Sequence, residues 1–438
     1  MKRVLIISPY FPPSNSADMQ RVRMSLPYFN NFGWEAEVVT VDPSYSDTVK
    51  DNLLIKSVPT NAVVHTVSAF SKNLTSKLGM GSIALRSLLF FKTRVNMLLK
   101  QKQYDLIYFS TTQFPVCILG AYWKKKFKVP YVIDMQDPWH SEYYRNKPKS
   151  ERPAKYWFSY RLNKYLEPIA MEAVDGLISV SEGYIKELKT RYPQLAKIPA
   201  EVITFGAFEK DFEITSVNQH LLKSNFPIDQ DLINVVYVGR GGHDMESAIR
   251  LLFEGFKDGL LSSPELLSGY RFHFIGTSYA PLGKGKLTVK PLAEEIGVSE
   301  YVIEQTDRVP FYEGINCLMK ADALVVLGSN DPQYTASKIY PYIMARKPLL
   351  AIFNSQSSAY DIIKDCRVGE VIALDDPGNS TKVISTFLLN IKNAEYATDW
   401  EMFSTYSAQN MTLKQCAFFD KVLASLKQAN RRSNKYNS

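Results

Sequence analysis

Cysteine is scarce in this sequence. Among 438 residues there are four cysteines, none of them in a CxxC pair, and they stand far apart at Cys117, Cys317, Cys366 and Cys416. A disulfide framework requires several closely spaced cysteines, and a zinc knuckle requires paired ones. The sequence therefore predicts neither, and we expect four reduced core residues.

Long apolar runs are lacking as well. No stretch reaches the roughly 18 to 20 residues of a membrane-spanning helix, and prolines interrupt the opening MKRVLIISPYFPPS too early for a signal peptide. We therefore expect a cytoplasmic protein. Hydrophobic residues make up 45% and charged residues 22% of the chain, a balance typical of folded soluble proteins. The length favours two domains of about 200 residues each.

Acidic residues are missing between Asp51 and Asp105. Eight basic residues occur there, which equals the net charge of +8 of the whole chain: Lys56, Lys72, Lys77, Arg86, Lys92, Arg94, Lys100 and Lys102. Because the helical part, residues 83–99, is apolar around much of its circumference, residues 72–103 could contact an anionic membrane surface peripherally. A buried helix with solvated lysines fits equally well. Nucleic acid is not expected as a partner, since aliphatic residues separate the basic ones and no reading motif is present.

Short β-rich runs alternate with helix-length segments throughout the chain. The runs are residues 3–7, 37–41, 106–109, 131–134 and 176–180, and then 233–239, 272–276, 321–329, 348–353 and 369–374. Such alternation is typical of βαβ units in parallel sheets covered by helices. We therefore predict an α/β protein with doubly wound domains over residues 1–210 and 228–395, joined by an irregular polar connection and closed by helical residues 398–428.

The loop after the opening strand, SPYFPPSNSADMQR, contains three prolines and no glycine. A GxGxxG sequence, whose glycines let the backbone approach a pyrophosphate, is absent, which argues against an NAD or FAD site. Ser14, Asn15 and Ser16 could donate hydrogen bonds to a polar ligand at the carboxyl end of the strand. They could equally form a turn and cap the next helix.

A second loop, DMQDPWHSEYY, follows the strand at residues 131–134. Asp137, Trp139, His140 and two tyrosines have the composition of a carbohydrate or polar-substrate site, with flat aromatic faces and hydrogen-bonding rims. We favour this interpretation over a simple turn at Asp137 and a core position for Trp139.

Two loops of the second domain are suited to an anion. In VGRGGHD, glycines and Arg240 precede a helix that Asp244 could cap, although the GxxxxGK[ST] spacing of a P-loop is absent. In YTASKIYPYI, Lys338 and the hydroxyls of Tyr334, Thr335 and Ser337 stand beside a helix N-terminus, where unpaired N–H groups favour negative charge. A plain helix cap is the alternative. Pro341 indicates a helix that begins near Tyr340 or has an irregular first turn.

In their order along the chain, several segments together resemble the family-4 glycosyltransferases of the GT-B fold. They are ISPYFPPS, FGWEAEVVTVDP, PYVIDMQDPW, ISVSEGY, VITFGAF, YVGR and SKIYPYIMARKPLLAI. The resemblance implies two Rossmann-like domains with a cleft between them and C-terminal helices that pack back on the first domain. It also implies transfer of a sugar from a nucleotide diphosphate donor, held by the second domain, to a glycan or lipid-linked acceptor, held by the first, in cell-surface polysaccharide or glycoconjugate synthesis.

For such a transfer we expect Arg240, Lys338, Gln136 and Asp137 to be the catalytic residues. Positive charge and N–H donors stabilise the leaving diphosphate, so neither a cofactor nor a metal is expected, and the sequence lacks clustered DxD carboxylates. The expected donor-binding residues are Gly239, Gly241, Gly276, Arg308, Val309, Tyr334, Thr335 and Ser337, and the expected acceptor-binding residues are Ser14, Asn15, Ser16, Arg21, Trp139 and His140. The resemblance further implies that the nucleobase lies near residues 308–311 and that anomeric configuration is retained.

The sequence departs from the family pattern at several positions. Pro341 stands where a Glu commonly holds the ribose, Arg346 where a Gly is expected, and Gln136 where a His is common, while the usual Lys after the GR loop is missing. Two alternatives therefore stay open. The first is a sugar-nucleotide epimerase, which shares the fold but needs groups for proton transfer, and the small number of five histidines argues against it. The second is a non-catalytic sugar-nucleotide-binding scaffold, which Pro341 favours.

Overall fold

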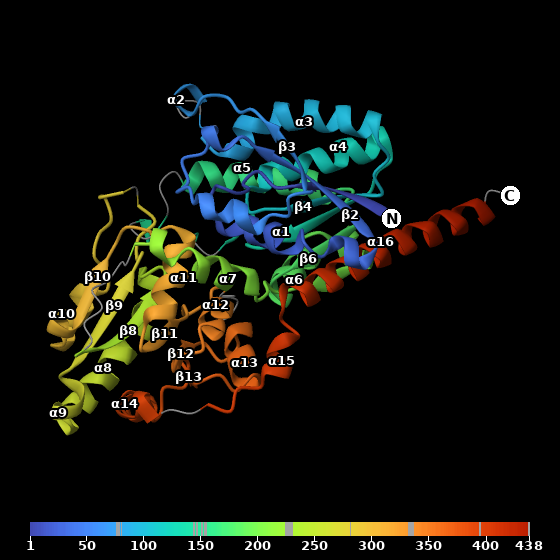
Figure 1. Cartoon of the computed structure of the whole chain (residues 1–438). Helices are drawn as coiled ribbons and strands as arrows, with labels where there is room; N and C mark the ends of the chain where they lie inside the picture. Colours follow the sequence, from blue (N-terminus) through green and yellow to red (C-terminus); the bar gives the residue numbers. More distant parts are fainter. Residues whose placement is uncertain are drawn as a thin grey trace. The chain divides into compact units, whose positions relative to one another are not determined.

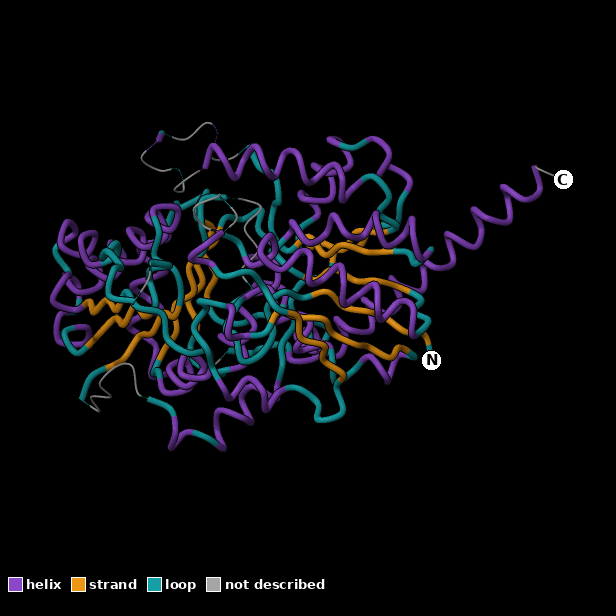
Figure 2. Tube along the Cα trace, turned by 90° about the horizontal axis from the view of Figure 1, so that it is seen from above, coloured by secondary structure: helices purple, strands orange, loops and turns teal. Residues whose placement is uncertain are grey.

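Two parallel β-sheets organise the chain, and helices cover them (Figure 1 and Figure 2). The computed structural model describes all residues except 76–78, 80, 143–144, 146–147, 150–151, 153–155, 224–230, 281, 332–336, 394–395 and 437–438. The chain divides into unit 1, Met1–Gly206 with Ala408–Ser438, and unit 2, Ala207–Ser407. The predicted α/β class with two doubly wound parallel sheets is confirmed.

Seven parallel strands form the sheet of unit 1, in the order β3-β2-β1-β4-β5-β6-β7. The strands are β1 Lys2–Ile7, β2 Trp34–Val41, β3 Val63–Val67, β4 Leu106–Ser110, β5 Tyr131–Met135, β6 Gly176–Ser179 and β7 Ala200–Val202. The helices are α1 Gln20–Ser25, α2 Lys72–Thr75, α3 Ile83–Gln101, α4 Ile118–Phe127, α5 Tyr156–Met171, α6 Glu182–Arg191 and α16 Ala408–Tyr436. The strand order reverses between β1 and β4, where such folds place their ligand sites.

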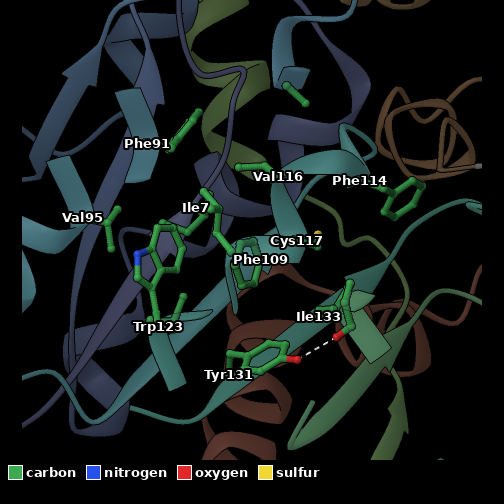
Figure 3. Close-up of a cluster of buried hydrophobic side chains, with 14 of the residues drawn as sticks. Ile7, Phe91, Val95, Phe109, Phe114, Val116, Cys117, Trp123, Tyr131 and Ile133 are labelled. Carbon is green, nitrogen blue, oxygen red and sulfur yellow. Dashed lines mark hydrogen bonds between the residues drawn. The ribbon is translucent and has the colours of Figure 1, made fainter. Parts of the chain in front are cut away.

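Both faces of this sheet are buried, as the near-continuous apolar runs of its strands require. Leu5 and Ile7 point into one core, which α3, α4 and α5 cover, and Val4 and Ile6 point into the other. In the first core the rings of Phe109 and Trp123 stack with 6.0 Å between their centroids (Figure 3).

The second core of unit 1 is closed by α16, which comes from the far end of the chain (Figure 1). Phe419 meets the ring edges of Trp34 at 5.4 Å and of Tyr108 at 5.0 Å. Gly176 lies so close beneath this helix that an added Cβ would stand 2.7 Å from Val422. The terminal helix is therefore an integral part of unit 1.

Six parallel strands form the sheet of unit 2, in the order β10-β9-β8-β11-β12-β13. The strands are β8 Ile233–Val238, β9 Tyr270–Ile275, β10 Val302–Gln305, β11 Ala323–Leu327, β12 Leu349–Phe353 and β13 Glu370–Ala373. The helices are α7 Glu209–Val217, α8 Glu246–Ser262, α9 Pro264–Leu267, α10 Lys290–Ile296, α11 Phe311–Lys320, α12 Ile339–Met344, α13 Ser358–Asp365, α14 Ser380–Asn390 and α15 Trp400–Ser404. Here the order reverses between β8 and β11.

Two details differ from the sequence prediction. The segment expected to be an irregular connection begins with helix α7, in which the buried Asp211 accepts a hydrogen bond from Tyr312 of α11 at 3.0 Å. The closing segment 398–428, expected as one or two helices on the first domain, forms two, of which α16 belongs to unit 1 and α15 belongs to unit 2. Most residues of α7 are polar, so its sequence lacks the apolar periodicity that would predict a helix.

Among the helices that the structure describes, none is both long enough and apolar enough to cross a bilayer.

Candidate functional site

The candidate site in unit 2 lies where the strand order reverses. The loop after β8 begins at Gly239, and α12, which follows β11, begins after Lys338. These two segments meet, because a Cβ added to Gly239 would stand 3.0 Å from Lys338 Nζ. A side chain at position 239 would crowd this amine, and the predicted convergence of the two segments is present in the structure.

Tyr237, the fifth residue of β8, holds the two segments together. Its buried phenol accepts a hydrogen bond from Lys338 Nζ at 2.6 Å and donates one to the carbonyl oxygen of Arg240 at 2.7 Å. The same amine lies 4.4 Å from the centre of the Tyr237 ring, within the range of a cation–π interaction. Tyr237 was not among the residues predicted from the sequence, since a tyrosine within a β-rich run is typical of core.

The guanidinium of Arg240 forms a two-pronged ion pair with Asp244. Nη1 lies 2.9 Å from Oδ1 and Nη2 lies 2.5 Å from Oδ2, and both side chains are about a quarter exposed, at 29% and 26%. Sequence reasoning assigned Asp244 to helix capping, but its carboxylate instead pairs with the arginine. An incoming anion would have to share or replace this partner.

Burial lowers the pKa of the Lys338 amine from its ordinary 10.5 to about 7. The positive charge of Arg240 lowers this pKa further, and Asp244 opposes the shift. The amine therefore changes charge close to neutral pH. A bound anion would favour the charged form and restore a higher pKa.

Pro341 is the third residue of α12 and falls in its first turn, where the missing N–H costs no intrahelical bond. The next residue, Tyr342, is buried and ties the helix to β8: its hydroxyl accepts from the Val238 N–H at 2.6 Å and donates to the Val238 carbonyl at 3.1 Å. The helix entrance is thus fixed against the strand end. Tyr334 and Thr335 lie outside the described residues, and Ser337 is exposed beside Lys338.

The other predicted donor-binding residues lie on the neighbouring loops of the same sheet edge. Gly276, just after β9, has a φ of +76°, and a Cβ there would lie 3.6 Å from Arg308 Cα. The exposed Arg308 holds its guanidinium 5.0 Å from the ring of Tyr279, which is also exposed, and Val309 is half-buried next to it. Gly241 is needed for packing, because a Cβ there would come within 2.9 Å of Val289.

In unit 1 the loop after β1 turns back on itself at the switch point between β1 and β4. Ser14 is buried, and the N–H of Asn15 donates to the carbonyl of Val49 at 2.7 Å. The Ser16 hydroxyl donates to Asp18, whose other oxygen accepts from Thr111 at 2.8 Å. Residues 14–16 therefore form the turn that was one of the two structures expected from the sequence.

Arg21, which was predicted to contact an acceptor, is buried and bonded within unit 1. Its guanidinium is 2% exposed and forms an ion pair with the fully buried Asp134, with 2.6 Å between Nε and Oδ2. It also donates to the backbone carbonyls of Ile203 at 2.7 Å and Thr204 at 2.9 Å. Arg21 is thus a structural side chain that fixes β5 and the strand-end segment near residue 204.

The residues predicted after β5 divide into buried and exposed ones. Gln136 is buried and donates through Nε2 to Ser110 at 3.0 Å and to Asp134 at 2.9 Å, whereas its Oε1 has no hydrogen-bond partner among the described residues. Asp137 is exposed. The Gln136 amide oxygen is therefore a buried acceptor with capacity left.

Trp139 and His140 are both buried. The Trp139 ring stacks on Phe114 with 5.4 Å between centroids, so this side chain is part of the core, and its predicted contact with an acceptor stays a prediction. Neither ring nitrogen of His140 has a hydrogen-bond partner among the described residues, and its ring lies 4.8 Å from that of Tyr160. Burial lowers the pKa of His140, and the positive charge of Arg191 adds to this effect, so the imidazole is neutral at pH 7.

Known proteins share sequence features and architecture with this chain. The model of Glycosyltransferase Family 4 matches residues 33–206, which lie in unit 1. HepE of Anabaena, solved in complex with UDP and glucose, has a TM-score of 0.54 and 15% sequence identity over 99% of this chain and 100% of its own. The chain has the GT-B fold, and its residues 33–206 are similar to Glycosyltransferase Family 4.

Two further solved GT-B structures are similar over nearly their whole length. An α,α-trehalose-phosphate synthase (UDP-forming) from Burkholderia vietnamiensis has a TM-score of 0.59 and 11% identity over 97% of this chain and 100% of that one. The UDP-GlcNAc 2-epimerase from Methanocaldococcus jannaschii has a TM-score of 0.52 and 11% identity over 96% and 100%. None of the curated proteins matches the sequence. At these identities the structural likeness establishes the fold, and the chemistry rests on the residues of this chain.

Proposed function

We propose that this protein is a glycosyltransferase that moves a sugar, of hexosyl type, from a nucleotide diphosphate to an acceptor. The observation that carries the proposal is the meeting of Lys338 Nζ with Gly239 at the switch point of unit 2, beside Arg240. A cationic amine, a guanidinium and backbone N–H groups at the end of a parallel sheet are the donors that a diphosphate prefers. HepE, with its UDP and UDP-glucose complexes, supports a nucleotide sugar as the ligand class.

The leaving diphosphate determines which residues matter for the rate. As the bond between the anomeric carbon and the β-phosphate oxygen breaks, negative charge grows on that oxygen, and donors already in place lower the barrier. Lys338 supplies one such donor, held by Tyr237. Arg240 supplies a second once the ligand has replaced Asp244 as its partner. With two cations at this position the proposed reaction needs neither a metal ion nor a cofactor.

Unit 1, which contains the residues that match the family model, is the proposed acceptor side. The unpaired Oε1 of Gln136 and the exposed carboxylate of Asp137 are the proposed contacts at the end of β5. His140 is neutral and buried next to them, so it would accept or donate hydrogen bonds without carrying charge. We propose a glycan or lipid-linked acceptor, retention of configuration, and a cytoplasmic enzyme of cell-surface polysaccharide synthesis.

A non-catalytic sugar-nucleotide-binding scaffold is the second candidate, and one observation favours it. Pro341 occupies the first turn of α12, where the family pattern places a ribose-binding carboxylate. An epimerase of the same fold is the third, favoured by the likeness to the 2-epimerase structure. The candidates differ in products: a transferase releases nucleotide diphosphate, an epimerase converts one sugar nucleotide to another, and a scaffold does neither.

A panel experiment separates these outcomes. The full chain is incubated with UDP-, GDP-, ADP- and dTDP-linked sugars, with and without lipid extracts and oligosaccharides, and nucleotide diphosphate and sugar nucleotides are quantified. We expect acceptor-dependent release of nucleotide diphosphate. Lys338→Met should weaken donor binding about 10- to 100-fold, from the loss of a charge-assisted hydrogen bond, while Lys382→Met on the exposed face of α14 should not. Binding without turnover supports the scaffold, and no binding of any sugar nucleotide contradicts all three.

A further inference from the structure

Glu304, the third residue of the edge strand β10, accepts hydrogen bonds from both ends of the loop that follows the neighbouring strand β9 (Figure 1). Its Oε1 accepts from the hydroxyl of Thr277 at 2.6 Å and from the N–H of Thr288 at 3.1 Å. Its Oε2 accepts from the N–H groups of Val289 at 2.9 Å and Lys290 at 2.8 Å. One carboxylate therefore holds the loop at its start and at its end.

Capping of helix α10 accounts for only half of these contacts. Val289 stands at the N-cap of this helix and makes no side-chain capping bond, so the two N–H groups bound to Oε2 gain their acceptor from Glu304. The other oxygen binds Thr277, which lies at the far end of the loop, directly after β9. Glu304 thus cross-links the two ends of the loop in addition to capping the helix.

The two threonines that Glu304 holds in turn hold Gly241, in the loop after β8. The N–H of Gly241 donates to the carbonyl oxygen of Thr277 at 2.9 Å, and the carbonyl oxygen of Gly241 accepts from the hydroxyl of Thr288. The packing at Gly241 is tight, because an added Cβ would stand 2.9 Å from Val289 and 3.1 Å from Thr288 Oγ1. A displacement of the threonines would therefore displace Gly241.

The peptide group between Arg240 and Gly241 is fixed from both sides. Its carbonyl oxygen accepts from the phenol of Tyr237 at 2.7 Å, and its N–H is the one that donates to Thr277. The position of this peptide determines where the guanidinium of Arg240 can reach. A misplacement of about 1 Å in a group that acts on the transition state can lower a rate about 100-fold, so the supports of this peptide matter for catalysis.

We propose that Glu304 is a positioning residue of the donor site, acting through Thr277 and Thr288 on the backbone of Arg240. Glu304 itself needs no contact with the ligand. It keeps the loop after β8 in the position from which the guanidinium of Arg240 reaches the leaving diphosphate. This inference rests on the proposed function, since it assigns a role within the same site.

Two variants and one control test the proposal. Glu304→Gln keeps the size of the side chain, but an amide has one acceptor oxygen and sets its NH2 group against N–H donors. Thr288→Val removes the hydroxyl that binds Gly241 and leaves the carboxylate in place. The matched control is Asp322→Asn, because Asp322 accepts from the N–H of Asn234 at 2.8 Å, at the opposite end of β8. Chemical denaturation measures the stability of each variant.

Titration calorimetry of the full chain, with the sugar nucleotide that binds best in the panel, gives the first readout. Glu304→Gln should weaken binding about 10-fold, because backbone donors lose their acceptor and the loop shifts. Thr288→Val should weaken it as well, and Asp322→Asn should leave it unchanged. In an Arg240→Met background, Glu304→Gln should weaken binding less than about 2-fold, because its effect passes through Arg240.

Three results of this titration overturn the proposal. They are natural affinity in Glu304→Gln, an equal loss with and without Arg240, and a loss of the same size in Asp322→Asn. A purely structural role of Glu304 would give the second result, since general destabilisation does not depend on which residue occupies position 240.

Hydrogen exchange gives a second readout that needs no ligand. The amide of Gly241 should exchange about 10-fold faster in Glu304→Gln than in the natural chain, and at the natural rate in Asp322→Asn. Unchanged exchange at Gly241 in Glu304→Gln overturns the proposal whether or not a ligand binds. If the natural chain binds no sugar nucleotide, the proposed function fails, and exchange at Gly241 then decides whether Glu304 positions this loop.

Discussion

The amine of Lys338 donates a hydrogen bond to the phenol of Tyr237, with 2.6 Å between Nζ and Oη. This contact joins the end of β8 to the start of α12, two segments about a hundred residues apart in the chain. Since Tyr237 also donates to the carbonyl of Arg240, one phenol positions both cations of the proposed donor site.

Donor binding should depend on pH through Lys338. Its pKa is lowered from 10.5 to about 7, so the amine is charged below that value and neutral above it. Because a diphosphate binds the charged form, affinity should fall as pH rises above about 7, by up to tenfold per pH unit. Isothermal titration with a sugar nucleotide between pH 6 and 9 measures this, and Lys338→Arg should remove the dependence. A natural chain whose affinity is flat across this range would contradict the assignment.

The lowered pKa of Lys338 should also affect folding stability, which should rise with pH where donor affinity falls. Between about pH 7 and 10.5 the unfolded chain keeps the proton of Lys338 and the folded chain does not, so this residue makes the free energy of unfolding increase with pH. Lys338→Met should therefore show a smaller increase over this window in urea denaturation. An identical pH dependence in both proteins would mean that the amine is not perturbed.

Tyr237→Phe should act on the proposed site through Lys338. Loss of the acceptor oxygen destabilises the charged amine, so the midpoint of the pH dependence of donor affinity should move below the natural value. Tyr270→Phe is the matched control, because that buried tyrosine donates to the carbonyl of Leu388 far along the chain. Both variants should lose about 1 kcal/mol of stability, and only Tyr237→Phe should shift the midpoint. A shift of equal size in both would reduce Tyr237 to a structural role.

Arg21→Met should destabilise the fold severely. The variant leaves the carboxylate of Asp134 buried without its ion-pair partner, and removal of one member of such a pair costs about 3 to 5 kcal/mol. Chemical denaturation of the two proteins measures the difference. If Arg21 served an acceptor and not the fold, stability would stay within about 0.5 kcal/mol of the natural value.

Arg346 should tolerate glycine better than alanine. Its φ of +54° lies in the left-handed region, where glycine is at ease and alanine pays about 1 kcal/mol. Its guanidinium lies 4.4 Å from the ring of Trp400, and both substitutions lose this contact. Arg346→Gly should therefore be more stable than Arg346→Ala by about 1 kcal/mol in thermal denaturation. The reverse order would show that position 346 does not adopt this backbone conformation.

The architecture could be predicted from the sequence because β-rich runs alternate with helix-length segments along the whole chain. Ten of the observed strands coincide with predicted β-rich runs, such as residues 3–7 and 233–239, and the loops suited to an anion could be identified because they follow strands. Helix α7 was missed because its sequence is polar around Asp211, and its stabilisation comes from a distant partner on α11.

The side-chain roles could be predicted only in part. Nothing in the sequence shows that Arg21 meets Asp134, since the two residues are brought together by strand order and not by spacing. Trp139 was assigned to a ligand because loop position suggests exposure, whereas stacking on Phe114 buries it. The convergence of Gly239 with Lys338 was predictable because parallel strands deliver their following loops to one edge.

The most direct measurement is a crystal structure of the chain with the sugar nucleotide that binds best in the panel. We predict an oxygen of the β-phosphate about 3 Å from Lys338 Nζ, with the guanidinium of Arg240 turned from Asp244 toward the diphosphate. A diphosphate bound elsewhere in unit 2, with the Lys338–Tyr237 and Arg240–Asp244 contacts unchanged, would contradict the account.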